Sequence, residues 1–242
     1  REMNIPVFHD DQHGTAIVVL AGIVNACKLL GKKIEELNVV INGAGAAGLA
    51  ISKLLTCFDI DPSVCTPVKQ IIMCDTKGII HKDRSDLNDF KREILRHTNP
   101  NNLKGTLKTA LKNADVFIGV SQANLLTKDD VASMNPEPII FPLANPNPEI
   151  TPEAAYEGGA GVVGTGRSDV PNQINNVLAF PGIFRGALDI RARRITPRMK
   201  VAAAYAIANC VTAIHRDNII PSTLDLNVAK CVAQAVKDAY LE

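Results

Sequence analysis

The sequence predicts an α/β fold: a doubly wound, mostly parallel sheet with helices on both faces and extra helices toward the C-terminus. Strand-like runs alternate with helical patterns as far as Pro181, which is typical of a parallel sheet. The strand runs are apolar throughout rather than alternating, as expected when helices cover both faces of a sheet. After Pro181 only helical patterns follow.

The predicted elements follow in order along the chain. Ile5–Phe8 has the composition of a short strand, and a helix is predicted over Gly14–Leu30. The strands expected next are Val39–Asn42, Gln70–Cys74, Val116–Val120, Pro138–Leu143 and Gly161–Val163. The helices expected between them are Ala46–Leu55, Leu87–Arg96, Leu107–Asn113, Lys128–Met134 and Pro152–Tyr156. No internal repeat or long linker interrupts this pattern, so residues 1–242 are expected to form one domain.

Two further helices are predicted near the C-terminus. Thr196 followed by Pro197 is a favourable N-cap and first-turn pair for a helix that reaches about His215. Asn227–Tyr240 is an amphipathic helix. Its apolar stripe consists of Val228, Cys231, Val232, Ala235, Val236 and Ala239. The stripe could contact a partner, but packing within the domain core is the favoured interpretation.

The composition excludes several classes of protein. The 242 residues include 26 basic and 25 acidic side chains, which argues against a nucleic-acid-binding or membrane-surface protein. The longest apolar run, Ile17–Val24, is too short to cross a bilayer, and no signal peptide opens the chain. The chain starts at Arg1 without an initiator Met, so we expect its N-terminus to be a cut. The six cysteines form no C-x-x-C pair and are expected to be reduced thiols in a cytoplasmic protein.

The segment Asn38–Gly48, NVVINGAGAAG, is the most informative motif. Gly43, Gly45 and Gly48 complete G-x-G-x-x-G between a strand and a helix, the pattern of a dinucleotide-binding turn. In this pattern the pyrophosphate lies at the helix N-terminus, where free N–H groups and the helix dipole bind an anion. Because the flanking strand and helix are both present, the sequence predicts a Rossmann-type domain that binds NAD or NADP.

Asp75 follows the second predicted strand, 27 positions beyond Gly48. A carboxylate there would accept both hydroxyls of the adenosine ribose and repel a 2′-phosphate, which favours NAD. Lys77 follows closely, and a lysine there could attract the phosphate of NADP. Asp75 could also simply cap a turn at the end of its strand. The choice of cofactor therefore stays open.

The run His9-Asp10-Asp11-Gln12-His13 superficially resembles the zinc motif H-E-x-x-H, which requires a formed helix and a glutamate base. Aspartate replaces the glutamate, and the helix is expected only from about Gly14, so a zinc hydrolase is not favoured. Asp10 and Asp11 instead offer hard oxygen ligands suited to Mg²⁺ or Mn²⁺. The alternative, equally supported by the sequence, is that both acids cap the helix that follows.

Three asparagines are candidate ligand contacts. Asn145 follows the strand Pro138–Leu143, where ligands bind in open α/β sheets. Asn175 and Asn176 precede an apolar turn, and each amide could bond a carboxylate or a carboxamide. Turn formation is the simpler explanation for any one of them. The loop 164–169 either lines the same cleft or is a polar connection.

Several segments together resemble one enzyme family. They are PVFHDDQHGTA (6–16), NGAGAAG (42–48), CDTKG (74–78), FPLANPNPE (141–149), TGRSDVPNQINN (165–176) and FPGIFRGALD (180–189). The chain is identified by this resemblance as the nucleotide-binding domain of a malic enzyme of the shorter bacterial type. The resemblance implies oxidation of (S)-malate by NAD(P)⁺ with Mn²⁺ or Mg²⁺, followed by decarboxylation to pyruvate and CO₂.

The resemblance also implies roles for individual residues. Asp11 would be one of three acidic metal ligands, Asp10 would lie beside a catalytic lysine, and Asn176 would be catalytic and bind substrate. Asn145 would contact substrate or nicotinamide. The positions implied to bind the cofactor are Gly43, Ala44, Gly45, Ala46, Ala47, Gly48, Asp75, Val120, Ser121, Asn145 and Asn175.

Other groups of the family's site are expected outside this chain. A general-base lysine and a general-acid tyrosine belong to a preceding domain, and a Glu–Asp pair of metal ligands would lie just before Arg1. The chain alone is therefore expected to bind cofactor weakly and to turn over negligibly. A homodimer or larger homo-oligomer is expected from the family.

Two other functions remain as alternatives. One is a dehydrogenase without decarboxylation, of the amino-acid or methylenetetrahydrofolate type, which would not need the pair Asp10 and Asp11. The other is a non-catalytic dinucleotide sensor. The fold alone cannot separate these three functions.

Overall fold

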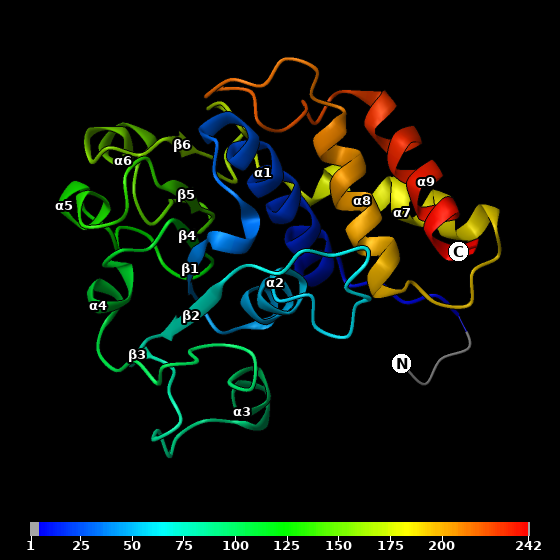
Figure 1. Ribbon diagram of the computed structural model, residues 1–242. Helices are drawn as coiled ribbons and strands as arrows, with labels where there is room; N and C mark the ends of the chain where they lie inside the picture. Colours follow the sequence, from blue (N-terminus) through cyan, green and yellow to red (C-terminus); the bar gives the residue numbers. More distant parts are fainter. Residues whose placement is uncertain (1–4, 242) are drawn as a thin grey trace.

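A six-stranded sheet forms the centre of the protein (Figure 1), and the computed structural model describes residues 5–241. The strand order is β3-β2-β1-β4-β5-β6. The strands are β1 (Asn38–Asn42), β2 (Gln70–Asp75), β3 (Gly78–Ile79), β4 (Val116–Gly119), β5 (Ile139–Pro142) and β6 (Val162–Val163). All neighbouring pairs are parallel except β2 with β3. The doubly wound, mostly parallel sheet predicted from the sequence is confirmed.

Two strand predictions differ from the structure. β3 was not predicted, because a two-residue strand that turns back on the end of β2 has no periodicity to detect. The strand predicted at Ile5–Phe8 is wrong, since these residues pair with no strand in the described part of the chain. Phe8 instead packs its ring against Phe184, with ring centroids 5.8 Å apart.

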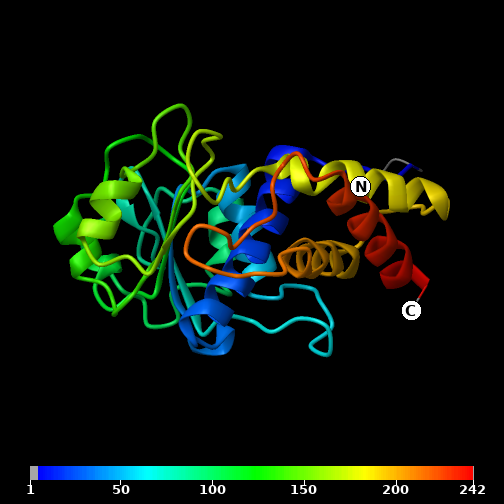
Figure 2. The ribbon, with the colours of Figure 1, turned by 90° about the horizontal axis from the view of Figure 1, so that it is seen from above.

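Helices surround the sheet. They are η1 (Asp10–Gly14, a π-helical turn), α1 (Thr15–Leu30), η2 (Ile34–Glu36), α2 (Ala46–Leu55), α3 (Asp89–Ile94), α4 (Leu107–Leu111), α5 (Lys128–Ala132), α6 (Pro152–Glu157), η3 (Asn176–Leu178), α7 (Phe180–Asp189), α8 (Pro197–Asn209) and α9 (Leu226–Leu241). Those predicted from the sequence occur in the predicted order, whereas η1, η2, η3 and α7 were not predicted. In Figure 1, α4, α5 and α6 lie on one side of the sheet, while α1 and α2 cover the other. Figure 2 shows α7, α8 and α9 gathered at the far end of the molecule from α5 and α6.

The two faces of the sheet bury two separate cores. Successive strand residues point to opposite faces, so Val39 and Ile41 join one core while Val40 joins the other. The larger core includes residues of α1, α2, α7, α8 and α9, and the smaller one includes residues of α4, α5 and α6. This two-sided burial explains why the strand sequences are apolar at consecutive positions.

Helix α1 is buried on all sides. Every residue from Ala16 to Cys27 is buried, and Asn25 donates hydrogen bonds to the carbonyls of Ala208 and Ile219 at 2.8 and 3.0 Å. The continuous helical span Asp10–Leu30 is long and apolar enough to cross a membrane, but 72% of its most apolar window is buried inside the protein. Within the described residues it is therefore packed as a core helix.

Both helices predicted near the C-terminus are present, and the first of them, α8, is shorter than predicted. Thr196 caps α8 by accepting a hydrogen bond from the Met199 N–H at 3.2 Å. α8 ends at Asn209 rather than near His215, and in the loop that follows the Asn172 side chain donates to the carbonyl of Arg216 and accepts from the N–H of Ile219. The stripe of α9 packs into the larger core through its valines, whereas Cys231, predicted to belong to the stripe, is exposed.

The cysteines differ from the prediction of six reduced thiols. Cys57 and Cys65 form a disulfide, and the four other cysteines are free. The chain leaves α2 through left-handed backbone conformations at Cys57 and Asp59, which turn it back so that the two cysteines meet. The prediction is therefore wrong for this pair, and the cysteine pattern no longer argues for a reducing compartment.

The contact between α7 and α9 gives a test of the packing. A Cβ added to Gly186 would lie 2.5 Å from the carbonyl oxygen of Ala233 and 2.9 Å from Cβ of Val236. We expect Gly186→Ala to lower the free energy of unfolding by about 1–3 kcal/mol, since the two helices must separate. Denaturant unfolding measures this, with Gly166→Ala as the control because its nearest neighbour is 3.9 Å away. Equal unfolding midpoints for both variants would contradict the described helix contact.

Candidate functional site

The candidate site lies at the carboxyl edge of the sheet, where β1 and β4 are neighbours. The chain leaves β1 toward β2 on one side, whereas β4 continues to β5 on the other, so this is the switch point of the doubly wound sheet. The backbone crosses this point closely, because the Val120 N–H bonds the carbonyl of Asn42 at 2.9 Å. Ligands of open α/β sheets bind at such a point.

The glycine-rich turn has the geometry that its motif predicts. Gly43 has a φ of +122°, and a Cβ there would lie 2.6 Å from the carbonyl oxygen of Val120. A Cβ on Gly48 would lie 1.8 Å from the carbonyl oxygen of Gly43, so this glycine permits close packing of helix and strand. A Cβ on Gly45 would meet nothing within 4 Å, and no side chain caps α2, which begins at Ala46. The turn therefore presents open space in front of a helix N-terminus.

Asp75 ends β2 as predicted, but its carboxylate is already engaged. Arg84 donates to both oxygens at 2.8 and 3.0 Å, Lys91 donates at 2.7 Å, and the Lys77 N–H donates at 2.9 Å. These four donors use the acceptor capacity of a carboxylate, so a ribose hydroxyl would have to displace one of them. The Lys77 side chain pairs with Asp86 at 2.8 Å. The turn-capping role is thus present, together with an ion-pair cluster that sequence reasoning missed.

Burial by itself would raise the pKa of Asp75, but the hydrogen bonds from Arg84 and Lys91 outweigh it and lower the pKa to about 2. The carboxylate therefore stays ionised and holds two cations beside the end of β2. Arg84 is nine-tenths buried, and no periodic signal near it could have indicated this pairing. Asp75 therefore holds a negative charge, paired with two cations, at the carboxyl end of β2.

The structure brings together Asp10 and Asn176, two predicted site residues 166 positions apart. The Asn176 amide donates to Oδ2 of Asp10 at 2.7 Å. Oδ1 of Asp10 is buried and has no hydrogen-bond partner within the described residues. A Cβ on Gly14 would lie 2.2 Å from that oxygen. Asp10 therefore does not cap the helix, and it presents an unsatisfied acceptor that a ligand or another protein group would satisfy.

Asp11 is exposed on the same π-helical turn, next to Asp10. Burial, and next the charge of Asp11, raise the pKa of Asp10. Two adjacent carboxylates, one with an unpaired buried oxygen, suit a hard divalent cation. Within residues 5–241, however, no group of three or more His, Cys, Asp or Glu side chains could hold a metal. The fit is thus partial, and the zinc-hydrolase arrangement of His9 and His13 is not formed by these residues.

The remaining predicted residues lie at the same edge of the sheet and differ in their exposure and hydrogen bonds. Asn145 and Ser121 are exposed after β5 and β4. Oδ1 of Asn175 accepts a hydrogen bond from the Val177 N–H at 3.0 Å, so this side chain caps η3. In the loop 164–169, Arg167 pairs with Asp169. Turn formation therefore accounts for the side-chain oxygen of Asn175, while the side chain of Asn145 is exposed to solvent.

Sequence reasoning missed Glu149, which is completely buried at this edge. Its carboxylate accepts hydrogen bonds from the N–H groups of Ser121 at 3.1 Å and Ala144 at 3.0 Å. The only signal was an acid directly after Pro148 in a proline-rich loop, which is equally typical of an exposed residue. Only the tertiary structure shows that it bridges the loops after β4 and β5.

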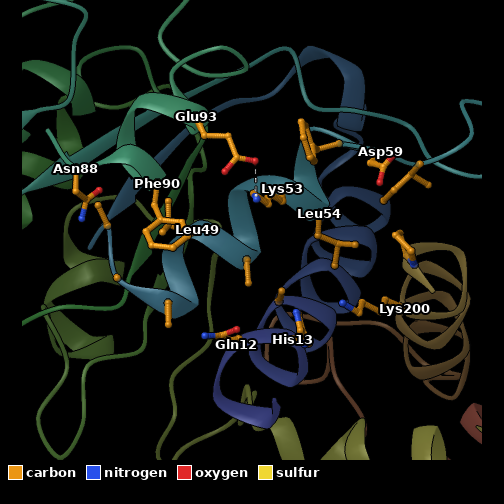
Figure 3. A pocket seen from close by; sticks show the side chains of 18 residues that line it. Gln12, His13, Leu49, Lys53, Leu54, Asp59, Asn88, Phe90, Glu93 and Lys200 are labelled. Atoms are coloured by element: carbon orange, nitrogen blue, oxygen red, sulfur yellow. Dashed lines mark hydrogen bonds and ion pairs between the residues drawn. The ribbon is translucent and has the colours of Figure 1, made fainter. Parts of the chain in front are cut away.

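A cavity of about 710 Å³ begins at the glycine-rich turn and runs beside α2 (Figure 3). Residues 44–46 contribute to its wall, Phe90 and Glu93 of α3 line it, and Lys200 of α8 lines it as well. Lys53 of α2 donates to Glu93 at 3.1 Å across it. The predicted residues after β2, β4 and β5 lie outside this cavity. Gln12 and His13 of η1 also line it, so the cavity extends from the glycine-rich turn to the turn that carries Asp10 and Asp11.

The fold and the turn together define a dinucleotide-binding domain of the Rossmann type: a switch point in a parallel sheet, an open glycine at the helix N-terminus, and an acid at the end of β2.

Comparison with known proteins identifies the family. A sequence profile of "Malic enzyme, NAD binding domain" matches residues 12–240. The chain is 56% identical over 245 residues to the bifunctional malic/malolactic enzyme of Bacillus subtilis, covering 100% of this chain and 58% of that protein. It is 52% identical to an NAD-dependent malic enzyme of Geobacillus stearothermophilus, covering 98% of this chain and 48% of that protein. Other relatives are named NADP-dependent malic enzymes.

A solved NAD-dependent malic enzyme from Thermotoga maritima has a TM-score of 0.90 and 50% identity, covering 98% of this chain and 60% of that one. The chain therefore belongs to the malic enzyme family, and it contains the NAD binding domain of that family. It spans about half to three-fifths of the length of these relatives.

The ion pairs of Asp75 predict a pH-dependent stability. A pKa lowered on folding stabilises the folded state above the unfolded value of about 4, and the contribution is lost as pH falls from about 4 to 2. We expect Asp75→Asn to lower the free energy of unfolding by about 2 kcal/mol at pH 7. The difference from the unsubstituted protein should shrink below about pH 3.

Chemical denaturation across this pH range measures the effect. Asp129→Asn, at an exposed acid, is the control and should change stability by less than about 0.5 kcal/mol. A loss for Asp75→Asn that stays constant from pH 7 to pH 2 would show that the charge pairing is not its cause.

Proposed function

We propose that this chain is the dinucleotide-binding part of a divalent-metal-dependent enzyme that oxidises (S)-malate and decarboxylates it to pyruvate and CO₂, with reduction of NAD⁺ or NADP⁺. One observation carries the proposal: the open turn at Gly45 and the bonded pair of Asp10 and Asn176 occupy the same edge of the sheet. The relatives that share this sequence are named malic enzymes, which supports the same activity for the whole protein.

The cofactor is proposed to lie across the switch point between β1 and β4. The N–H groups at the start of α2, from Ala46 onward, would bind its pyrophosphate, with residues 43–48 close to it. Asp75 and its two cations would face the adenosine ribose. Val120, Ser121 and Asn145 would contact the nicotinamide half, beyond β4 and β5.

Mn²⁺ or Mg²⁺ is proposed as the metal cofactor, with Asp11 as the ligand from this chain. When bound, the ion supplies Lewis-acid polarisation of substrate oxygen atoms. Asp10 is proposed to receive a catalytic lysine at its unpaired Oδ1, while Asn176 holds the other oxygen and fixes the carboxyl group. Asn145 and Asn176 would also bond the substrate carboxylate without adding charge.

The remaining catalytic groups are proposed to lie outside this chain. They are the general-base lysine, the general-acid tyrosine and two further acidic metal ligands, in a preceding domain. We also propose a homodimer or larger homo-oligomer in the cytoplasm. The groups outside this chain and the oligomeric state follow from the family resemblance.

The open space at Gly45 gives a direct test of cofactor binding. Gly45→Ala should fold normally but raise the Kd for the dinucleotide by about tenfold or more, because its methyl group would occupy the place of the phosphates. Gly48→Ala should instead destabilise the fold, since its Cβ strikes the backbone. Calorimetric titration with NAD⁺, and separately with NADP⁺, measures both the effect and the cofactor choice. Unchanged affinity in Gly45→Ala would place the pyrophosphate elsewhere.

Asp11→Asn in the full-length protein tests the metal-dependent function. We expect malate-dependent reduction of NAD(P)⁺ to fall by about 100-fold, since a lost carboxylate ligand weakens metal binding. The Kd for the dinucleotide without metal should stay within about twofold, and the unsubstituted enzyme in EDTA should match the variant. A non-catalytic sensor would show no malate-dependent rate, and a simple dehydrogenase would show no requirement for Mn²⁺ or Mg²⁺.

A further inference from the structure

Glu149 is a buried carboxylate that the proposed reaction does not use. Its side chain is 0% exposed, and no basic side chain pairs with it within residues 5–241. Burial raises its pKa, and the N–H donors of Ala144 and Ser121 oppose that rise. Burying a carboxylate without a cation is costly, so its presence requires an explanation beyond simple packing.

The contacts of Glu149 join two loops that start at neighbouring strands. Oε1 accepts from the Ser121 N–H at 3.1 Å, and Oε2 accepts from the Ala144 N–H at 3.0 Å. Ser121 lies two residues after the end of β4, and Ala144 lies two residues after the end of β5. The Glu149 carbonyl also accepts from the Leu126 N–H at 3.0 Å, which anchors the far side of the first loop.

Two neighbouring residues, Gly119 and Asn42, support this contact. A Cβ on Gly119 would lie 2.2 Å from Cδ of Glu149, so the last residue of β4 leaves space for the carboxylate. The Asn42 amide, at the end of β1, donates to Oγ of Ser121 at 2.7 Å. A hydrogen-bonded chain therefore runs across the ends of β1, β4 and β5 through Asn42, Ser121 and Glu149.

We propose that Glu149 is a positioning residue that holds the loops after β4 and β5 at the spacing required by the nicotinamide half of the dinucleotide. This inference rests on the proposed function. In a doubly wound sheet one half binds the adenosine nucleotide and the other half binds the second nucleotide, across the switch point. Glu149 contacts only the second half, so its loss should affect one end of the cofactor.

The experiment compares Glu149→Gln with the unsubstituted protein at full natural length. Glutamine keeps the size but places an NH₂ group against one of the two N–H donors, so one hydrogen bond is lost. Calorimetry with NAD⁺ or NADP⁺, whichever binds more tightly, should show about tenfold weaker binding. ADP, or 2′-phospho-ADP if NADP⁺ binds more tightly, lacks the nicotinamide half and should bind to the variant within about twofold of its affinity for the unsubstituted protein. The KM for the dinucleotide should rise in the same proportion.

Asp115→Asn is the control, because Asp115 is another buried carboxylate, at the amino end of the sheet, where Lys32 lies 3.6 Å from it. It accepts from the Asn38 N–H at 2.9 Å and from Asn135 at 2.9 Å. It should lower stability and leave both titrations unchanged. If Glu149→Gln does not fold, Gly119→Ala provides the second variant, since it displaces the carboxylate without removing it. Dinucleotide binding should again weaken while binding of the adenosine half is unchanged.

The outcomes separate the two proposals. Equal loss of dinucleotide and ADP binding in Glu149→Gln, or no loss of either, would overturn the role of Glu149 and leave the proposed function intact. A selective loss of dinucleotide binding in Asp115→Asn would do the same. If the unsubstituted full-length protein binds neither compound, the proposed function is wrong and this inference is wrong with it.

Discussion

The burial of α1 is the constraint on which the rest of the structure depends. A helix that is apolar on all sides must be covered on all sides, and here the sheet lies on one side and α8 with its neighbours on the other. Because α1 is followed by a short connection to β1, it runs opposite to the strands, and its first turn lies at their carboxyl edge. The packing of α1 therefore places Asp10 and Asp11 at the carboxyl edge of the sheet. The C-terminal helices close the same core and place η3, with Asn176, against that turn.

Three carboxylates along this edge show how environment decides the role of one chemical group. Asp75 accepts hydrogen bonds from Arg84, Lys91 and a backbone N–H, so it holds two cations in place at the end of β2. Glu149 is buried with backbone donors only, so it joins two loops. One carboxylate oxygen of Asp10 accepts a hydrogen bond and the other is buried without one. Of these three carboxylates, only Asp10 has an unpaired oxygen within the described residues. The sequence shows three acids, while their hydrogen bonds show that the first is saturated, the second joins two loops and the third has an unpaired oxygen.

The fold was predictable where both faces of an element are buried. The five strands were located to within one or two residues, because continuous apolar runs between turn residues leave few alternatives. The short β3, the C-terminal end of α8 and the disulfide between Cys57 and Cys65 were not, since none of them is marked by a hydrophobic period. In the candidate site, the glycine turn has the geometry that its motif predicts. The partners of Asp75 escaped prediction because ion pairs across loops carry no periodicity.

By itself, the sequence determined the class of fold, the dinucleotide turn and the family, because these depend on local periodicity and on residue types at fixed short spacings. Tertiary structure alone decided that Asp10 meets Asn176 across 166 residues and that Glu149 bridges two loops. It also decided that Asp75 is engaged by basic side chains before any cofactor arrives. The physical reason is common to all three. A hydrogen bond is directional and short, so its partner is chosen by where the packed core brings the chain, and spacing along the sequence does not specify that place.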